Sequence, residues 1–256
     1  ITRGTTGKVG KVGVIVTPFY QPGDYPTVVG YHQNRKVLGG SPLEPNVVYL
    51  SKVNDFSNFA FFEEIEFSET TIKDSSEWAD QLVPETRTET SFVQQIQASS
   101  AIKLVFATEK NESLKNACSY GDLYIGTGTS EWVIPANVNA TNVQAVLADR
   151  TGSDDSQARF VKGGVAFVSR DRRSVRVFSA GSGTIDLMQA ASHIAKAGIN
   201  DLDVRQVPDS ELWCVLDDGT AVAMTKAGEG SAWWPMSTKP GHLLKSVAVL
   251  PGATED

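Results

Sequence analysis

Short apolar runs, each followed by a turn and a second apolar run, recur at four places along the chain. The pairs start near residues 35, 122, 165 and 212, and their members are mostly β-branched, leucine or aromatic residues. Gly, Asp, Ser and Pro separate the two runs, as at Asp218-Gly219, where glycine can supply the positive φ of a tight turn. The pattern predicts four antiparallel β-hairpins.

The apolar residues inside these runs are consecutive rather than alternating with polar ones. Strands that are covered on both faces have this pattern, and each blade of a β-propeller lies between two neighbours. The later hairpins start about forty to fifty residues apart, a usual blade length, and the first gap is about twice as long. A degenerate unit within residues 59–107 could fill that gap. We therefore predict an all-β fold, a β-propeller or partial propeller of antiparallel hairpin blades.

Residues 185–197 are the exception, because their apolar positions recur at helical spacing. Thr184 can serve as the N-cap and Gly198 can end this short helix, while His193 within it is expected to be a structural group. We interpret residues 1–256 as a single domain. Because the chain begins at Ile1 and ends after a strand-like run at 242–250, we also interpret it as a segment of a longer polypeptide.

Negative charge is concentrated in one stretch of the chain. Residues 63–89 contain nine acidic and two basic residues, so nine minus two equals the whole net charge of −7. We interpret residues 63–90 as a solvated acidic insert or loop. The same charge would also suit a surface along which DNA slides, because each Lys or Arg contact to phosphate strengthens binding.

The residues that carry enzyme or metal chemistry show no known spacing. Cys118 and Cys214, with three histidines, make neither a disulfide framework nor a metal motif, and are expected to be buried or half-buried thiols. The segment GTTGKVGK lacks the spacing of a phosphate loop, no Gly-x-Ser-x-Gly elbow occurs, and the adjacent aspartate pairs suit turns better than a glycosidase cleft. We predict no enzymatic activity, no cofactor and no membrane span.

Two groups of residues are candidates for structural or binding roles. In the corner after the strand at 47–50, Asp55 and Asn58 can cap backbone groups, while Phe56 and Phe59 can fill the space between neighbouring blades. The tryptophans lie in or beside predicted strands, where aromatic residues usually belong to the core. If exposed, they would suit carbohydrate binding, which leaves that alternative open.

The segment from residue 21 to 59 resembles the opening signature of a family of bacteriophage tail proteins. Its matching positions are Gly23, Tyr25-Pro26, Val28-Val29, Gln33-Asn34-Arg35, Gly40-Ser41, Pro45, Val47 to Leu50, Ser51, and Asp55 to Phe59. Later segments agree in order as far as residue 238, and include the strands around Trp132, Trp213 and Trp233 and the Asp218-Gly219 turn. Lys36, where the family has a bulkier apolar residue, and the acidic insert depart from the pattern.

The resemblance implies a structural virion protein, similar to the nozzle or packaged-DNA-stabilisation components of short phage tails. Members of that family are β-propeller proteins that form rings around the DNA exit channel. It implies a homo-oligomeric ring in the virion, made in the bacterial cytoplasm, with other tail or portal-adaptor proteins as partners and DNA passing without tight binding. The alternative is a carbohydrate- or receptor-binding β module of a tail-associated adhesin. The residues expected to hold the structure are Arg35, Ser51, Asp55, Phe56, Asn58, Phe59, Trp132, Trp213, Asp218, Gly219 and Trp233.

Overall fold

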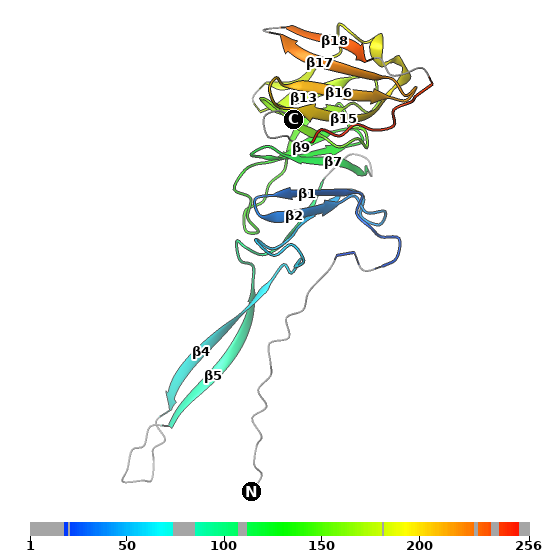
Figure 1. Cartoon of the computed structure of the whole chain (residues 1–256). Helices are drawn as coiled ribbons and strands as arrows, with labels where there is room; N and C mark the ends of the chain where they lie inside the picture. The colour runs from blue at the N-terminus through cyan, green and yellow to red at the C-terminus, as the bar shows by residue number, and fades with distance from the viewer. Residues whose placement is uncertain are drawn as a thin grey trace, which may run out of the picture.

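Four antiparallel four-stranded sheets follow one another along the chain and stack face to face (Figure 1). The computed structural model describes residues 18–19, 21–73, 85–106, 112–180, 182–227, 230–236 and 241–250. We name the sheets blades 1 to 4 in chain order. They stack as neighbouring propeller blades do but do not close into a ring, so the prediction of an all-β partial propeller is confirmed.

Strand order within each blade follows the chain. Blade 1 contains β1 (Val28–His32), β2 (Arg35–Gly39), β3 (Val47–Leu50) and β6 (Ile102–Val105). Blade 2 contains β7 (Leu114–Ser119), β8 (Leu123–Thr127), β9 (Glu131–Ile134) and β10 (Val146–Asp149). Blade 3 contains β11 (Arg159–Val161), β12 (Gly164–Val168), β13 (Val175–Ser179) and β14 (Gly183–Asp186). Blade 4 contains β15 (Ile199–Arg205), β16 (Glu211–Leu216), β17 (Ala221–Ala227) and β18 (Gly230–Met236).

The second and third strands of each blade are the four hairpins predicted from the sequence. Every residue of β3, β8 and β12 is buried, as expected from their consecutive apolar residues. The core between blades 1 and 2 includes Val48, Leu50, Leu123 and Ile125. Tyr124, Val165 and Phe167 lie between blades 2 and 3, and Val168, Leu202, Leu212 and Cys214 lie between blades 3 and 4. Alternate residues of one strand therefore serve two different cores.

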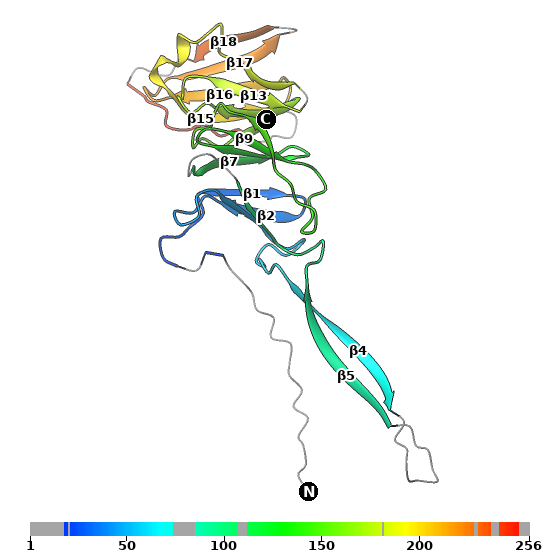
Figure 2. The same cartoon turned by 180° about the vertical axis from the view of Figure 1, so that it is seen from behind.

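The long first gap contains a projecting arm, and the degenerate blade expected there is wrong. Strands β4 (Glu63–Lys73) and β5 (Glu85–Gln95) pair with each other in one unbroken register and with no other described strand. The chain then returns as β6 to complete blade 1, so the acidic stretch is an insertion between the third and fourth strands of that blade. Figure 2 shows this arm extending past blade 1, away from the other blades. Residues 74–84 of the acidic stretch lie outside the described residues.

The helix predicted over 185–197 is wrong for most of its length. Thr184 lies in β14, paired with β13, instead of capping a helix. Turns follow, and only Ile194–Ala197 forms a short 3₁₀ helix, η1, which ends as predicted at a glycine, Gly198, with φ of 95°. Strand pairing at the edge of blade 3 thus outweighs local helical spacing. Among the described residues, no helix is long and apolar enough to cross a membrane.

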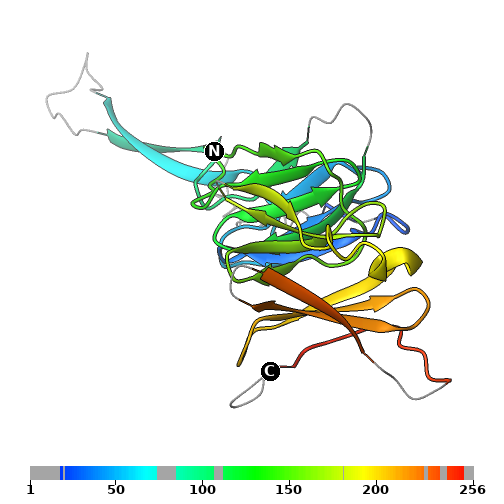
Figure 3. The ribbon, with the colours of Figure 1, turned by 90° about the horizontal axis from the view of Figure 1, so that it is seen from above.

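Residues 241–250 form an extended segment, the strap, that runs along the open face of blade 4. Figure 3 shows the strap against blade 4 and the arm leaving the opposite side of the stack. The described portion of the molecule thus carries two elements, the arm and the strap, that belong to no four-stranded blade.

Candidate functional site

The predicted corner is built around the buried guanidinium of Arg35. This side chain is 1% exposed, and its Nη1 donates to the carbonyls of Ser51 and Ser100, both at 2.7 Å. Its Nη2 donates to the carbonyl of Ala98 at 2.8 Å. Burial lowers the pKa of Arg35, but a guanidinium stays charged at physiological pH. Because Ser51 precedes the arm and Ala98 and Ser100 follow it, Arg35 fastens both ends of the arm to blade 1.

Short polar side chains complete the corner. The Ser51 hydroxyl accepts the N–H of Lys36 at 2.9 Å and donates to the carbonyl of Lys52 at 3.0 Å. Asp55 Oδ1 accepts the hydroxyl of Ser57 at 2.9 Å, which lowers the pKa of the carboxyl, and Asn58 Oδ1 accepts the N–H of Ala60 at 3.0 Å. These hydrogen bonds hold the backbone of the corner in place. The side chains that make them do not converge on one point, as catalytic groups would.

The two phenylalanines of the corner lie in two different environments, and neither environment is the one predicted. Phe59 is 3% exposed and packs with Leu38, Val47 and Tyr49 on the face of blade 1 that is turned away from blade 2. Phe56 is 46% exposed and makes an edge-to-face contact with Tyr31, with ring centroids 5.4 Å apart. Neither ring lies between neighbouring blades, because the corner follows β3 on the outer side of blade 1. The expectation that both rings fill an inter-blade space is therefore wrong.

The predicted tryptophans are half-buried parts of the framework. Trp132 donates its indole N–H to Ser130 Oγ at 3.0 Å and packs against the ring of Phe106. Trp233 donates to the carbonyl of Leu187 at 2.9 Å. Trp213 lies on the open face of blade 4, and its buried indole nitrogen has no hydrogen-bond partner among the described residues. Two of these three indoles thus use their polar group inside the protein.

The Asp218-Gly219 turn joins β16 to β17 and also supports the strap. Asp218 Oδ1 accepts the hydroxyl of Thr220 at 2.6 Å and the N–H of Thr220 at 2.9 Å, and these two hydrogen bonds, the hydroxyl's first, lower the pKa of the carboxyl. Gly219 has φ of +78°, a conformation that strains other residues. A Cβ at this position would lie 2.6 Å from Leu243 Cβ. Glycine is therefore needed both for the turn and for the close approach of the strap.

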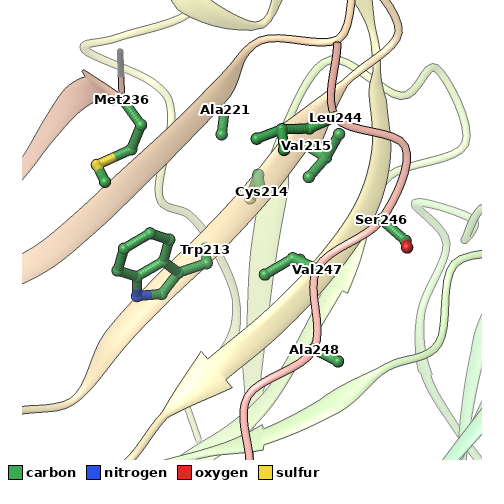
Figure 4. Close-up of a pocket in the computed structure, with 9 residues that line it drawn as sticks. All are labelled: Trp213, Cys214, Val215, Ala221, Met236, Leu244, Ser246, Val247 and Ala248. Carbon is green, nitrogen blue, oxygen red and sulfur yellow. The ribbon is translucent and has the colours of Figure 1, made fainter. Parts of the chain in front are cut away.

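A pocket of about 350 Å³ separates the strap from the open face of blade 4 (Figure 4). Its lining residues are Trp213, Cys214, Val215, Ala221, Met236, Leu244, Ser246, Val247 and Ala248. The only lining residue with a titratable side chain is Cys214, a buried residue that belongs to the core between blades 3 and 4 and whose thiol pKa is raised by burial. The pocket is therefore suited to apolar contacts rather than to acid–base chemistry.

Glu131 is a buried carboxyl that the sequence reasoning did not single out. Its Oε2 accepts the N–H of Thr151 at 3.1 Å, and its Oε1 accepts the hydroxyl of Ser153 at 3.2 Å. Burial, assisted by the charge of Asp149 on the neighbouring strand, raises the pKa of Glu131 to about 7. The only sequence signal was an acidic residue within an otherwise apolar hairpin strand.

His32 and Ser119 lie side by side between β1 and β7. The Nδ1 atom of buried His32 is 2.8 Å from Ser119 Oγ, and burial lowers the pKa of the imidazole, with Asp122 acting in the opposite direction. A nucleophile–base pair needs a third group to orient the base, but Nε2 has no hydrogen-bond partner among the described residues. This contact links two blades. Throughout the residues that the structure describes, no group of three or more His, Cys, Asp or Glu side chains is placed to hold a metal ion.

No protein-family model and no curated protein matches this chain. Among solved structures, it is similar to Raptor of Chaetomium thermophilum, with a TM-score of 0.50 and 11% sequence identity over 88% of this chain. It spans 18% of that Raptor chain. It is also similar to the WD40 domain of Neurospora crassa Pan2, with a TM-score of 0.41 and 12% identity over 90% of this chain and 70% of that one. At such low identity, the likeness to Raptor bears on the fold alone.

Proposed function

We propose that this protein is a structural subunit of a phage tail, forming part of a ring around the DNA exit channel. The observation that carries the proposal is the corner around Arg35. Arg35, Ser51, Asp55 and Asn58, which carry the resemblance to phage tail proteins, come together there and hold backbone segments in place. Residues that carry a family resemblance and hold backbone segments together are suited to a structural protein.

The polar groups that could suggest an enzyme have structural partners. The carboxyl of Glu131 bonds to the segment that joins blades 2 and 3, and His32 bonds across to blade 2. The alternative of a carbohydrate-binding module gains nothing from Trp132 and Trp233, because their indole N–H groups are bonded inside the protein. We therefore develop only the structural role.

The open stack of blades suits assembly into a ring. Blade 1 and blade 4 each have one face without a neighbouring blade, so joining two copies end to end would use two different surfaces. Such contacts generate a closed ring when the rotation between copies closes. Other tail or portal-adaptor proteins would bind above and below, and negative charge beside the channel would let DNA slide.

The oligomeric state tests this proposal. The chain is purified and its molar mass is measured by light scattering over a range of protein and salt concentrations, followed by negative-stain electron microscopy. We expect one discrete oligomer that appears as a ring with a central opening. A protein that stays monomeric at every concentration, alone and with neighbouring tail proteins, would contradict the proposed role.

A further inference from the structure

The segment at residues 150–158 carries the chain from blade 2 to blade 3 and bonds to both blades; we call it the link. The N–H of Ser153 donates to the carbonyl of Thr127, at the end of β8 in blade 2, at 2.8 Å. The next N–H, that of Asp154, donates to the carbonyl of Val168, at the end of β12 in blade 3, at 3.0 Å. The contact between the two blades therefore depends on the position of the link.

A buried carboxyl, that of Glu131 on β9, holds the link against blade 2. Glu131 and Ser153 are 0% and 1% exposed. Glu131 Oε2 accepts the N–H of Thr151 at 3.1 Å, and its Oε1 accepts the hydroxyl of Ser153 at 3.2 Å. The same hydroxyl lies 3.1 Å from that of buried Tyr124. One carboxyl thus binds two residues of the link inside the protein.

Among the described residues, no basic group is paired with Glu131 to balance a negative charge. The titratable and charged side chains on the elements around it are Tyr124 of β8, Asp149 of β10, Arg150, Asp154 and Asp155 of the link, Arg176 of β13 and Asp186 of β14. Of the two arginines, Arg150 is exposed and Arg176 lies 3.7 Å from the carboxylate of Asp186. A buried carboxylate without a cationic partner is costly, so the closed link favours the neutral acid.

The two protonation states of Glu131 differ in what they require of the link. A neutral carboxyl keeps its bond from Thr151 and can donate its own proton to Ser153 Oγ, so it is satisfied without water. An ionised carboxyl only accepts hydrogen bonds and gains from access to water, which the closed link denies it. Burial accordingly raises the pKa of Glu131 to about 7, although the bond from Thr151 acts in the opposite direction. Ionisation of this side chain therefore favours an open link.

The second half of the link has attachments that do not titrate. Asn116 Nδ2 donates to the carbonyls of Asp154 and Ser156 at 3.0 and 3.2 Å. These bonds join uncharged groups and do not change with pH. An opening caused by Glu131 is therefore confined to the first half of the link, residues 150–153.

We propose that Glu131 is a proton-dependent latch: ionisation of its carboxyl, as pH rises through neutrality, releases residues 150–153 and loosens blade 3 from blade 2. The pKa of the closed state lies above the ordinary value of 4.5. The hold of the latch is therefore complete below about pH 4.5 and is lost as pH rises to about 7. The latch lies within one chain, so this inference goes beyond the proposed ring and its test does not depend on that ring.

Hydrogen exchange of the Ser153 amide, followed by NMR on the full chain from pH 5.5 to pH 8, tests the latch. Each rate is divided by the intrinsic exchange rate at the same pH, so that only the opening equilibrium remains. With a pKa of 4.5 in the open state and about 7 in the closed state, we expect opening to increase by about 25-fold over this range. Glu131→Gln is similar in shape and does not ionise, so it is the matched control and should show no such increase.

Two results on the pH dependence would overturn the latch: opening that stays constant in the wild-type chain, or opening that increases equally in Glu131→Gln. Low concentrations of urea then distinguish local opening from global unfolding, because a local opening exposes little surface and barely responds to urea. We expect the Ser153 amide at pH 8 to exchange at the same rate with and without urea. A rate that rises with urea as steeply as global unfolding does would refute a local latch.

Discussion

The carboxyl of Glu131 should make this protein less stable as pH rises, which is the opposite of the effect of a carboxyl whose pKa is lowered by folding. In the folded chain the side chain is fully buried between blade 2 and the segment leading to blade 3, and burial raises its pKa to about 7. In the unfolded chain the pKa returns to the ordinary value of 4.5. The folded state therefore holds this proton more tightly. The stabilising contribution of the protonated carboxyl is complete below about pH 4.5 and is lost as pH rises to about 7.

The size of the effect follows from the difference between the two pKa values. From 4.5 to about 7 is roughly 2.5 units, and each unit is worth about 1.4 kcal/mol, so the loss amounts to about 3 kcal/mol. Other carboxyls, such as Asp149, have lowered pKa values and act in the opposite direction. The contribution of Glu131 is thus visible only as a difference between two variants.

Glu131→Gln is the matched comparison, because the amide is similar in shape and does not ionise. Free energies of unfolding are measured by urea titration of both proteins from pH 4.5 to pH 8. We expect the difference to shift in favour of the glutamine variant by about 3 kcal/mol across this range, with most of the change between pH 5 and 7. A difference that stays constant over the whole range would refute the assignment of a raised pKa to Glu131.

Three further predictions concern the corner and the strap. Arg35→Met should lower the free energy of unfolding by about 3–5 kcal/mol, because three buried carbonyls lose their donor; a loss below about 1 kcal/mol in urea titration would contradict the clamp. Phe59→Ala should cost about 3–5 kcal/mol and Phe56→Ala about 1 kcal/mol or less, and equal shifts in thermal unfolding would contradict their different burial. Gly163→Ala should cost about 1–2 kcal/mol because its φ is positive, and Gly219→Ala should cost more, because its added Cβ would also press against Leu243. Only Gly219→Ala should speed tryptic cleavage within the strap, and equal cleavage would show that the close approach is unimportant.

The inner hairpins of the blades were predictable because their chemistry is local. Each consists of two apolar runs and a turn, and burial on both faces makes the runs continuous. The outer strands carry much less signal. In β10, Val146 and Leu147 are exposed, and β14 is short and half-buried, so neither strand has a periodicity that distinguishes it from a loop. For this reason the last two residues of β14, 185–186, were predicted to begin a helix, with Thr184 as its N-cap.

The arm could not be predicted because it is a two-stranded sheet apart from the blades. Hydrophobic periodicity arises where one side of an element is buried against a neighbouring sheet, and β4 and β5 pair with each other and with no other described strand. Its two indirect signs in the sequence, a doubled gap between hairpins and a concentration of acidic residues, were compatible with a further blade or with a loop. The sequence therefore indicates where such a charged insertion lies, but it does not indicate which structure the insertion forms.

The sequence located the corner but did not predict its central interaction, the hydrogen bonds of the Arg35 guanidinium. The strand and the polar residues that follow it are contiguous, so capping by Asp55 and Asn58 could be anticipated. The carbonyls of Ala98 and Ser100 that receive the Arg35 guanidinium lie beyond the arm, 63 and 65 residues away in sequence. No local pattern indicates such a contact. The same limit applies to Glu131, whose pKa depends on the segment around Thr151 that folds over it.

The two ends of the stack are covered in different ways. Repeat architectures need their terminal units covered, because an exposed blade face would otherwise attract other molecules. At blade 1 the chain covers part of that face with Phe59, so the cover is a packed aromatic core. At blade 4 the cover is the strap, an extended segment whose N–H groups donate to the carboxylates of Asp201 and Asp203. The outer face of blade 1 is thus covered by packed side chains, whereas that of blade 4 is covered by main-chain hydrogen bonds to one extended segment.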